Sequence, residues 1–90
     1  MYTLIFTESY LKKEKRFIKK HPELKERYKK VLTILAADPH YPSLRLHKLQ
    51  GKLKEYCSVS ISMSYRIVID LVITDKEIIL LDIGSHDEVY

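Results

Sequence analysis

The fold is decided by residues 55–84, which form the stretch EYCSVSISMSYRIVIDLVITDKEIILLDIG. In its first segment Cys57, Val59 and Ile61 alternate with serines. An alternation with a period of two predicts a strand with one apolar face and one polar face. Residues 65–73 and 77–84 are two further β-rich segments that follow after short connections. Three consecutive strands joined by tight turns predict an antiparallel meander.

The residues before this stretch predict one more strand and a first helix. Residues 2–7 are short and β-rich, which is typical of a strand. In residues 8–20 the aromatic side chains of Tyr10 and Phe17 are seven positions apart, with lysines between them. This spacing predicts an amphipathic helix, and Thr7 or Ser9 is the expected N-cap.

A second helix follows the sequence HPEL at residues 21–24. Apolar residues recur at helical spacing from Leu24 to Leu35, and Pro22 suits the first turn. We expect the helix to end near Asp38, because Pro39 disfavours helix in the residue before it. The predicted order is β-α-α-β-β-β, an α+β fold with two helices packed on one face of a small, mainly antiparallel sheet.

Size and composition limit the class of protein. Ninety residues predict a single domain, residues 1–90. The single cysteine, Cys57, excludes an internal disulfide and suits a reducing compartment. No apolar run has the length of a membrane span, and residues 1–10 do not resemble a signal peptide. We therefore expect a cytoplasmic protein with no membrane association.

The charge is unevenly distributed along the chain. Residues 9–54 carry 14 Lys and Arg against 4 acids, whereas residues 55–90 carry 2 against 7. A basic half of this density predicts an acidic or polyanionic partner, although a solvated helical surface accounts for many of the lysines. The four histidines are scattered without a Cys/His cluster, and the chain has only two glycines. We therefore predict no metal site, no glycine-rich phosphate loop and no cofactor.

The remaining chemistry-bearing residues lie near the ends of the predicted strands. They are His47, Lys48, Lys52 and Lys54 before the second strand, Tyr65 and Arg66 on the third, and His86 and Tyr90 after the fourth. Adjacent antiparallel strands can bring these side chains onto one surface. The set suits RNA cleavage by attack of the 2′-hydroxyl on the neighbouring phosphate, which needs a base, an acid and positive charge but no metal. Histidine serves as acid or base, arginine binds phosphate oxygens, and tyrosine stacks on a splayed base.

Each of these residues also has a structural interpretation. His86 can cap the tail, Arg66 can pair with Asp70 or Glu88, and Tyr90 can hold the tail on the sheet. Alternation places Ser58, Ser60, Ser62, Arg66 and possibly Asp70 on the face away from the helices. We expect that face to be polar, as a ligand surface or simply as a solvated one.

Residues 44–72, LRLHKLQGKLKEYCSVSISMSYRIVIDLV, and residues 78–90, IILLDIGSHDEVY, resemble the RelE/ParE superfamily of bacterial toxins, and within it the YafQ-like branch. The resemblance implies a RelE-like fold and a toxin of a type II toxin–antitoxin system. It implies a ribosome-dependent mRNA endoribonuclease that cuts codons in the A site, inhibits translation, and is silenced by a cognate acidic antitoxin.

The resemblance also implies roles for individual residues. His86 corresponds to the presumed proton donor, His47 to an active-site histidine, and Arg66 to the arginine that stabilises the phosphate. Tyr90 matches the terminal aromatic of the motif. Lys52 and Lys54 correspond to phosphate-binding lysines.

The chain departs from the YafQ-like pattern at two positions. Ser60 and Ser64 stand where that branch has a histidine and an aspartate, and Tyr65 replaces its tryptophan. The general base is therefore left to His47 or to Lys52. The alternative functions are a ParE-like, non-enzymatic inhibitor of DNA gyrase and a catalytically weak RNA-binding module.

Overall fold

The computed structural model describes residues 1–89. The elements in chain order are β1 (Thr3–Phe6), α1 (Glu8–Lys20), the 3-10 turn η1 (Pro22–Leu24), α2 (Lys25–Ala37), the 3-10 turn η2 (Pro42–Leu44), β2 (His47–Lys48), the 3-10 turn η3 (Gly51–Leu53), β3 (Cys57–Ser60), β4 (Tyr65–Val72), β5 (Glu77–Ser85) and α3 (His86–Val89). The five strands form one sheet in the order β1-β5-β4-β3-β2. β1 is parallel to β5, and the other pairs are antiparallel.

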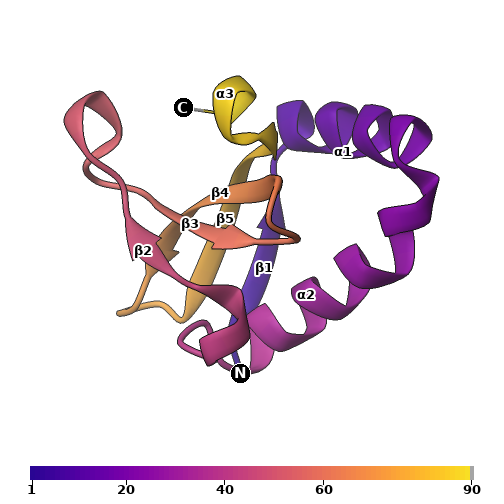
Figure 1. Cartoon of the computed structure of the whole chain (residues 1–90). Helices are drawn as coiled ribbons and strands as arrows, with labels where there is room; N and C mark the ends of the chain where they lie inside the picture. The colour runs from indigo at the N-terminus through magenta and orange to yellow at the C-terminus, as the bar shows by residue number, and fades with distance from the viewer. Residues whose placement is uncertain (90) are drawn as a thin grey trace.

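The expected α+β architecture is confirmed, with α1 and α2 on the same side of the sheet (Figure 1). α1 begins after Thr7, whose side chain accepts a hydrogen bond from the Tyr10 N–H at 3.2 Å. α2 ends at Ala37, with Asp38 as its C-cap, one residue before Pro39. Besides the three 3-10 turns, the structure adds a short strand and a short helix to the expected order, which are β2 within the predicted loop and α3 in the tail.

The main core lies between the two long helices and the inner face of the sheet. Its fully buried members from the central strands include Val59, Ile67, Ile78 and Leu80. Tyr10, Phe17 and Leu35 cover them from the helices. Burial of this many apolar side chains supplies the main driving force for folding.

A second, smaller cluster lies on the outer face of the sheet, away from α1 and α2. Leu49, Val68 and Val89 are buried there, and Leu53, Tyr56 and Leu81 pack against them. The loop before β3 and the helix α3 therefore cover part of this face. The expectation of a polar outer face is correct for Ser60 and Arg66 but wrong for the area around Ser58, which is fully buried.

An irregularity in β5 determines which side chains near its end face the core. Val68 pairs with Asp82 and Ile69 pairs with Leu80, so Leu81 is an extra residue in the ladder. The shift places Leu80 in the main core and Leu81 against the outer cluster. Under strict alternation from Leu80, Ile83 would face outward. The extra residue instead turns Ile83 inward, where it lies beside Ile67 in the main core.

A buried hydrogen-bond network joins α1 to α2. The Tyr28 hydroxyl donates to Glu14 Oε2 at 2.5 Å and lies 2.7 Å from the Tyr10 hydroxyl. Burial raises the pKa of both phenols above the ordinary tyrosine range. Both hydroxyls therefore stay protonated, and the Tyr10 hydroxyl donates to Tyr28.

Among residues 1–89 there is no helix with the length and the apolar run that crossing a bilayer requires.

We expect Tyr28→Phe to lower the free energy of unfolding by about 1–3 kcal/mol, because it leaves the buried Tyr10 hydroxyl and the Glu14 carboxylate without their shared partner. The measurement is a denaturant midpoint. Tyr41→Phe is the matched control, since Tyr41 is 49% exposed, and it should change stability by less than about 0.5 kcal/mol. Equal stability of the two variants would contradict a structural role for the network.

Candidate active site

The outer face of the sheet carries a groove that contains two of the predicted catalytic side chains. Its volume is about 510 Å³, and its lining residues are His47, Lys48, Leu49, Gln50, Lys52, Leu53 and His86. We call this the histidine groove. His47 comes from β2 and His86 from the start of α3, so the fold joins residues that are far apart in the sequence. Among residues 1–89, those that line the groove are basic, apolar or, for Gln50, an uncharged amide, and none is a carboxylate.

His47 is oriented by its own turn and by the neighbouring strand. Its Nδ1 lies 3.3 Å from the Arg45 carbonyl, and Ser58 Oγ lies 3.4 Å from each ring nitrogen. His47 also pairs with Ser58 in the β2–β3 ladder. When Nδ1–H donates to the carbonyl, Nε2 carries the lone pair. The imidazole then has an acceptor nitrogen, which is the form that a general base requires.

The backbone around His86 is held by a capping box at the start of α3. The Ser85 N–H donates to Glu88 Oε1 at 2.9 Å, and the Glu88 N–H donates to Ser85 Oγ at 3.3 Å. Hydrogen bonding of the Glu88 carboxyl to Ser85, to its backbone N–H first and to its side chain second, holds the pKa of that carboxyl below its ordinary value. The ionised Glu88 carboxylate therefore stabilises the folded state at neutral pH. This stabilisation is lost as the pH falls through the lowered pKa of Glu88.

The other end of α3 is fixed by packing. Val89 is 7% exposed and lies in the outer cluster with Leu49 and Val68. Leu49 also lines the histidine groove. The residue that anchors α3 and the loop that carries His47 therefore share one small apolar cluster.

Arg66 lies on the same outer face but in a neighbouring hollow. Its Nη1 donates to Ser60 Oγ at 3.1 Å, and in the ladder it stands opposite Ser60 and Gly84. This hollow has a volume of about 360 Å³ and is lined by Arg27, Ser43, Arg45, Ser60, Ile61, Ser62, Met63 and Arg66. We call it the arginine cup. The structure thus brings His47 and His86 together in one hollow and places Arg66 in the adjacent one.

The remaining predicted site residues have different positions. Lys48 and Lys52 line the histidine groove, whereas Lys54 is exposed and is not among the lining residues. The Tyr65 ring packs on the helix side of the sheet, with ring centroids 4.5 Å from His21 and 5.4 Å from Phe17. Tyr65 is therefore not part of the groove, because adjacent residues of a strand face opposite sides and Arg66 faces outward. Tyr90 lies outside the described residues.

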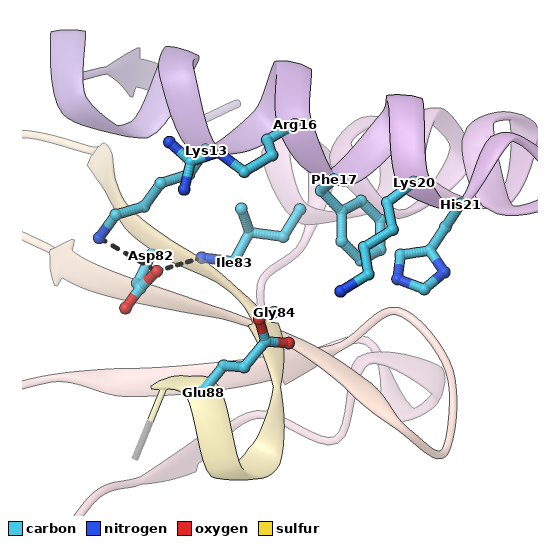
Figure 2. A pocket seen from close by; sticks show the side chains of 9 residues that line it. All are labelled: Lys13, Arg16, Phe17, Lys20, His21, Asp82, Ile83, Gly84 and Glu88. Carbon is cyan, nitrogen blue, oxygen red and sulfur yellow. Dashed lines mark hydrogen bonds and ion pairs between the residues drawn. The ribbon is translucent and has the colours of Figure 1, made fainter.

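A third hollow, of about 230 Å³, lies between α1 and α3 (Figure 2). Figure 2 shows Lys13 reaching from α1 to Asp82 on β5 and Lys20 pointing toward Glu88, while Arg16 runs along α1. Lys13 Nζ lies 3.2 Å from Asp82 Oδ1. This hollow contains charges of both signs, and Glu88 connects it to the cap that holds the backbone around His86.

The contacts of three residues that support the site were missed from the sequence. Arg45 supplies the carbonyl for His47, Ser58 lies under the same ring, and Ser85 caps α3. Only the last had a local signal, because the sequence SHDE at residues 85–88 matches the Ser-x-x-Glu pattern of a capping box. The role of Ser58 depends on which strand pairs with β3, and no local pattern gives that pairing.

The chain shares its fold with solved bacterial toxins. A metal-bound toxin from Helicobacter pylori superposes with a TM-score of 0.81 at 26% identity, over 100% of both chains. YafQ from Escherichia coli strain BL21(DE3) gives a TM-score of 0.81 at 17% identity, over 100% of this chain and 99% of that one. A chain of the E. coli DinJ-YafQ toxin–antitoxin complex gives 0.78 at 21% identity, over 99% and 97%.

The likeness is one of structure more than of sequence. No protein-family model matches the chain, and no curated protein matches it in sequence. The identities to the two YafQ structures are low enough that they establish the fold alone.

We expect Ser85→Ala to loosen α3 by about 1 kcal/mol, because the change removes the acceptor for the Glu88 N–H. Hydrogen exchange of the Glu88 amide should become roughly fivefold faster or more, while the denaturant midpoint changes little. Ser9→Ala, an exposed serine in the first turn of α1, is the control. Unchanged exchange at Glu88 would show that the capping box does not hold α3.

Proposed function

We propose that this chain, whose fold is that of the RelE/YafQ-like toxin superfamily, is the toxin of a type II toxin–antitoxin system that cuts mRNA in the ribosomal A site. The observation that carries the proposal is the histidine groove. Two imidazoles from separate elements line one hollow together with Lys48 and Lys52. A pair of imidazoles beside basic side chains has the groups that metal-free RNA cleavage needs.

The reaction is a transfer within the RNA backbone. A base removes the proton from a ribose 2′-hydroxyl, and the oxygen attacks the adjacent phosphorus. The bond from phosphorus to the 5′-oxygen of the next nucleotide breaks, and an acid protonates that oxygen. The products are a 2′,3′-cyclic phosphate and a 5′-hydroxyl, so no water, oxidant or reductant is consumed.

We assign His47 as the base and His86 as the acid. The hydrogen bond between His47 Nδ1 and the Arg45 carbonyl makes Nε2 the acceptor nitrogen of the ring, and we assign to it the 2′-hydroxyl proton. Lys52, which lines the same groove, is the alternative candidate for the base. Lys48, Lys52 and Arg66 supply positive charge for the phosphate oxygens.

The partners in this proposal are a cognate acidic antitoxin, the ribosome and its mRNA. An E. coli relative by structure is known as part of a toxin–antitoxin complex, which supports an antitoxin for this chain. The excess of Lys and Arg over acids in residues 9–54 suits attraction both to an acidic antitoxin and to ribosomal RNA. Both partners imply a cytoplasmic location.

The proposed reaction uses no metal or other cofactor. The H. pylori relative by structure is described as metal-bound. In the part of this chain that the structure describes, no three His, Cys, Asp or Glu side chains gather in a way that could hold a metal ion. The proposed acid and base are both imidazoles, and the charge on the phosphate is met by lysine and arginine side chains.

We expect His86→Ala and His47→Ala each to reduce mRNA cleavage by about 10²- to 10⁴-fold, since each removes one proton-transfer group. The measurement is the mapping of mRNA ends after induced expression, together with growth arrest. His40→Ala is the matched control, because His40 is exposed and lines none of the three hollows, and it should stay toxic.

The same experiment separates the alternative functions. In-frame cuts within codons that disappear in His86→Ala agree with the proposal. DNA damage without mRNA cuts would instead favour a ParE-like gyrase inhibitor. RNA binding without either effect would favour a catalytically weak RNA-binding module, and toxicity that survives both substitutions would refute the catalytic assignment.

A further inference from the structure

We propose that the arginine cup binds a backbone phosphate of the RNA beside the one that is cut, with Arg27 and Arg45 as its principal ligands. The inference rests on the proposed function, because it assigns a second subsite to the same substrate. Neither residue belongs to the predicted catalytic set. Arg27 comes from α2 and Arg45 from the turn after η2.

The composition of the cup suits a phosphate. Three guanidinium groups and the side chains of Ser43, Ser60 and Ser62 line it, and none of its lining residues is an acid. A guanidinium group can donate two parallel hydrogen bonds to two oxygens of one phosphate. Serine hydroxyl groups can donate to the remaining oxygens. The hollow between α1 and α3 differs in this respect, because Asp82 and Glu88 already supply counter-charges there.

Within residues 1–89, no salt bridge pairs the guanidinium groups of the cup with an acid. Among residues 1–89 the salt bridges join Lys13 to Asp82, His21 to Glu23 and Lys29 to Glu26, and none involves an arginine. Cations that share a hollow without an anion repel one another. A bound phosphate would relieve that repulsion.

The backbone at Arg45 gives independent support. Its φ of 51° and ψ of 47° place it in the left-handed region, which is unfavourable for a residue with a Cβ. Strained residues of this kind concentrate at functional sites. Arg45 connects the two hollows, since its side chain lines the cup and its carbonyl lies against His47 Nδ1.

The cup and the histidine groove are neighbours along β3. Ser58, under the His47 ring, and Ser60, which accepts from Arg66, are two residues apart on the same face of the strand. Their separation is about 7 Å by strand geometry. An extended RNA strand can cross this distance, so one nucleotide can occupy the groove while the next phosphate enters the cup. This continuity favours RNA over an acidic peptide as the occupant.

The test measures binding of a fluorescent 2′-O-methyl oligoribonucleotide, which cannot be cut through its 2′-oxygen, by fluorescence anisotropy at several salt concentrations. We expect Arg45→Gln and Arg27→Gln each to weaken binding roughly 3- to 10-fold at moderate salt. The slope of log affinity against log salt should fall by about 0.7 for each lost phosphate contact. Arg16→Gln removes the same charge from α1 and lies outside the cup, so it should change affinity less than twofold.

The outcomes decide the proposal. Equal effects of Arg45→Gln and Arg16→Gln, with unchanged denaturant midpoints, would overturn it. So would a loss of poly-L-glutamate binding as large as the loss of RNA binding, because the cup would then accept any polyanion.

If Arg45→Gln weakens RNA binding but the wild-type protein cuts no mRNA, the cup stands and the proposed function fails. If the wild-type protein cuts mRNA but its RNA affinity is insensitive to Arg45, the proposed function stands and the cup fails.

Discussion

Val89 and Leu49 pack over Val68 on the outer face of the sheet, and this small contact connects α3 to the loop that carries His47. It adds a direct link between the two segments, which the strand ladder otherwise joins only through β3 and β4. Burial of one valine side chain contributes about 1.5 kcal/mol or slightly more, and the Ser85–Glu88 cap adds about 1 kcal/mol. The groove is therefore held by only a few kcal/mol, far less than the main core. Segments with this little support open locally before the rest of a protein unfolds.

The inner face of the sheet forms the core, and the outer face carries the candidate site. The inner face packs against α1 and α2 and supplies most of the buried apolar surface. The outer face is covered only in part and holds the histidine groove, and the arginine cup lies next to it at the end of β3, where Arg27 of α2 also lines it. Rigid strands thus set the spacing of the polar groups, while short turns supply the walls. This division suits a site that must align a flexible substrate with fixed proton-transfer groups.

The sequence was most informative where a periodic pattern extends over several residues. Helical spacing and capping residues located α1 and α2, and alternation located β3, β4 and β5. Alternation also contains the information that Tyr65 and Arg66 face opposite sides, as they do. A two-residue strand such as β2 has no period to detect. The extra residue Leu81 reverses the facing of Ile83 and cannot be inferred from alternation. The wall of the histidine groove comes largely from residues 42–53, and the arginine cup takes Ser43 and Arg45 from the same stretch. Proline, glycine and short 3-10 turns leave no pattern there that fixes which side chains meet.

The central claim is that His47 and His86 act as base and acid within one groove. The most direct measurement is the pH dependence of single-turnover mRNA cleavage on programmed ribosomes, for the wild-type protein and for His47→Ala and His86→Ala. A base must be unprotonated and an acid protonated, so the account predicts a bell-shaped profile. Its low-pH limb should disappear in His47→Ala and its high-pH limb in His86→Ala. Survival of both limbs in both variants would contradict the account, because the titrating groups would then lie elsewhere.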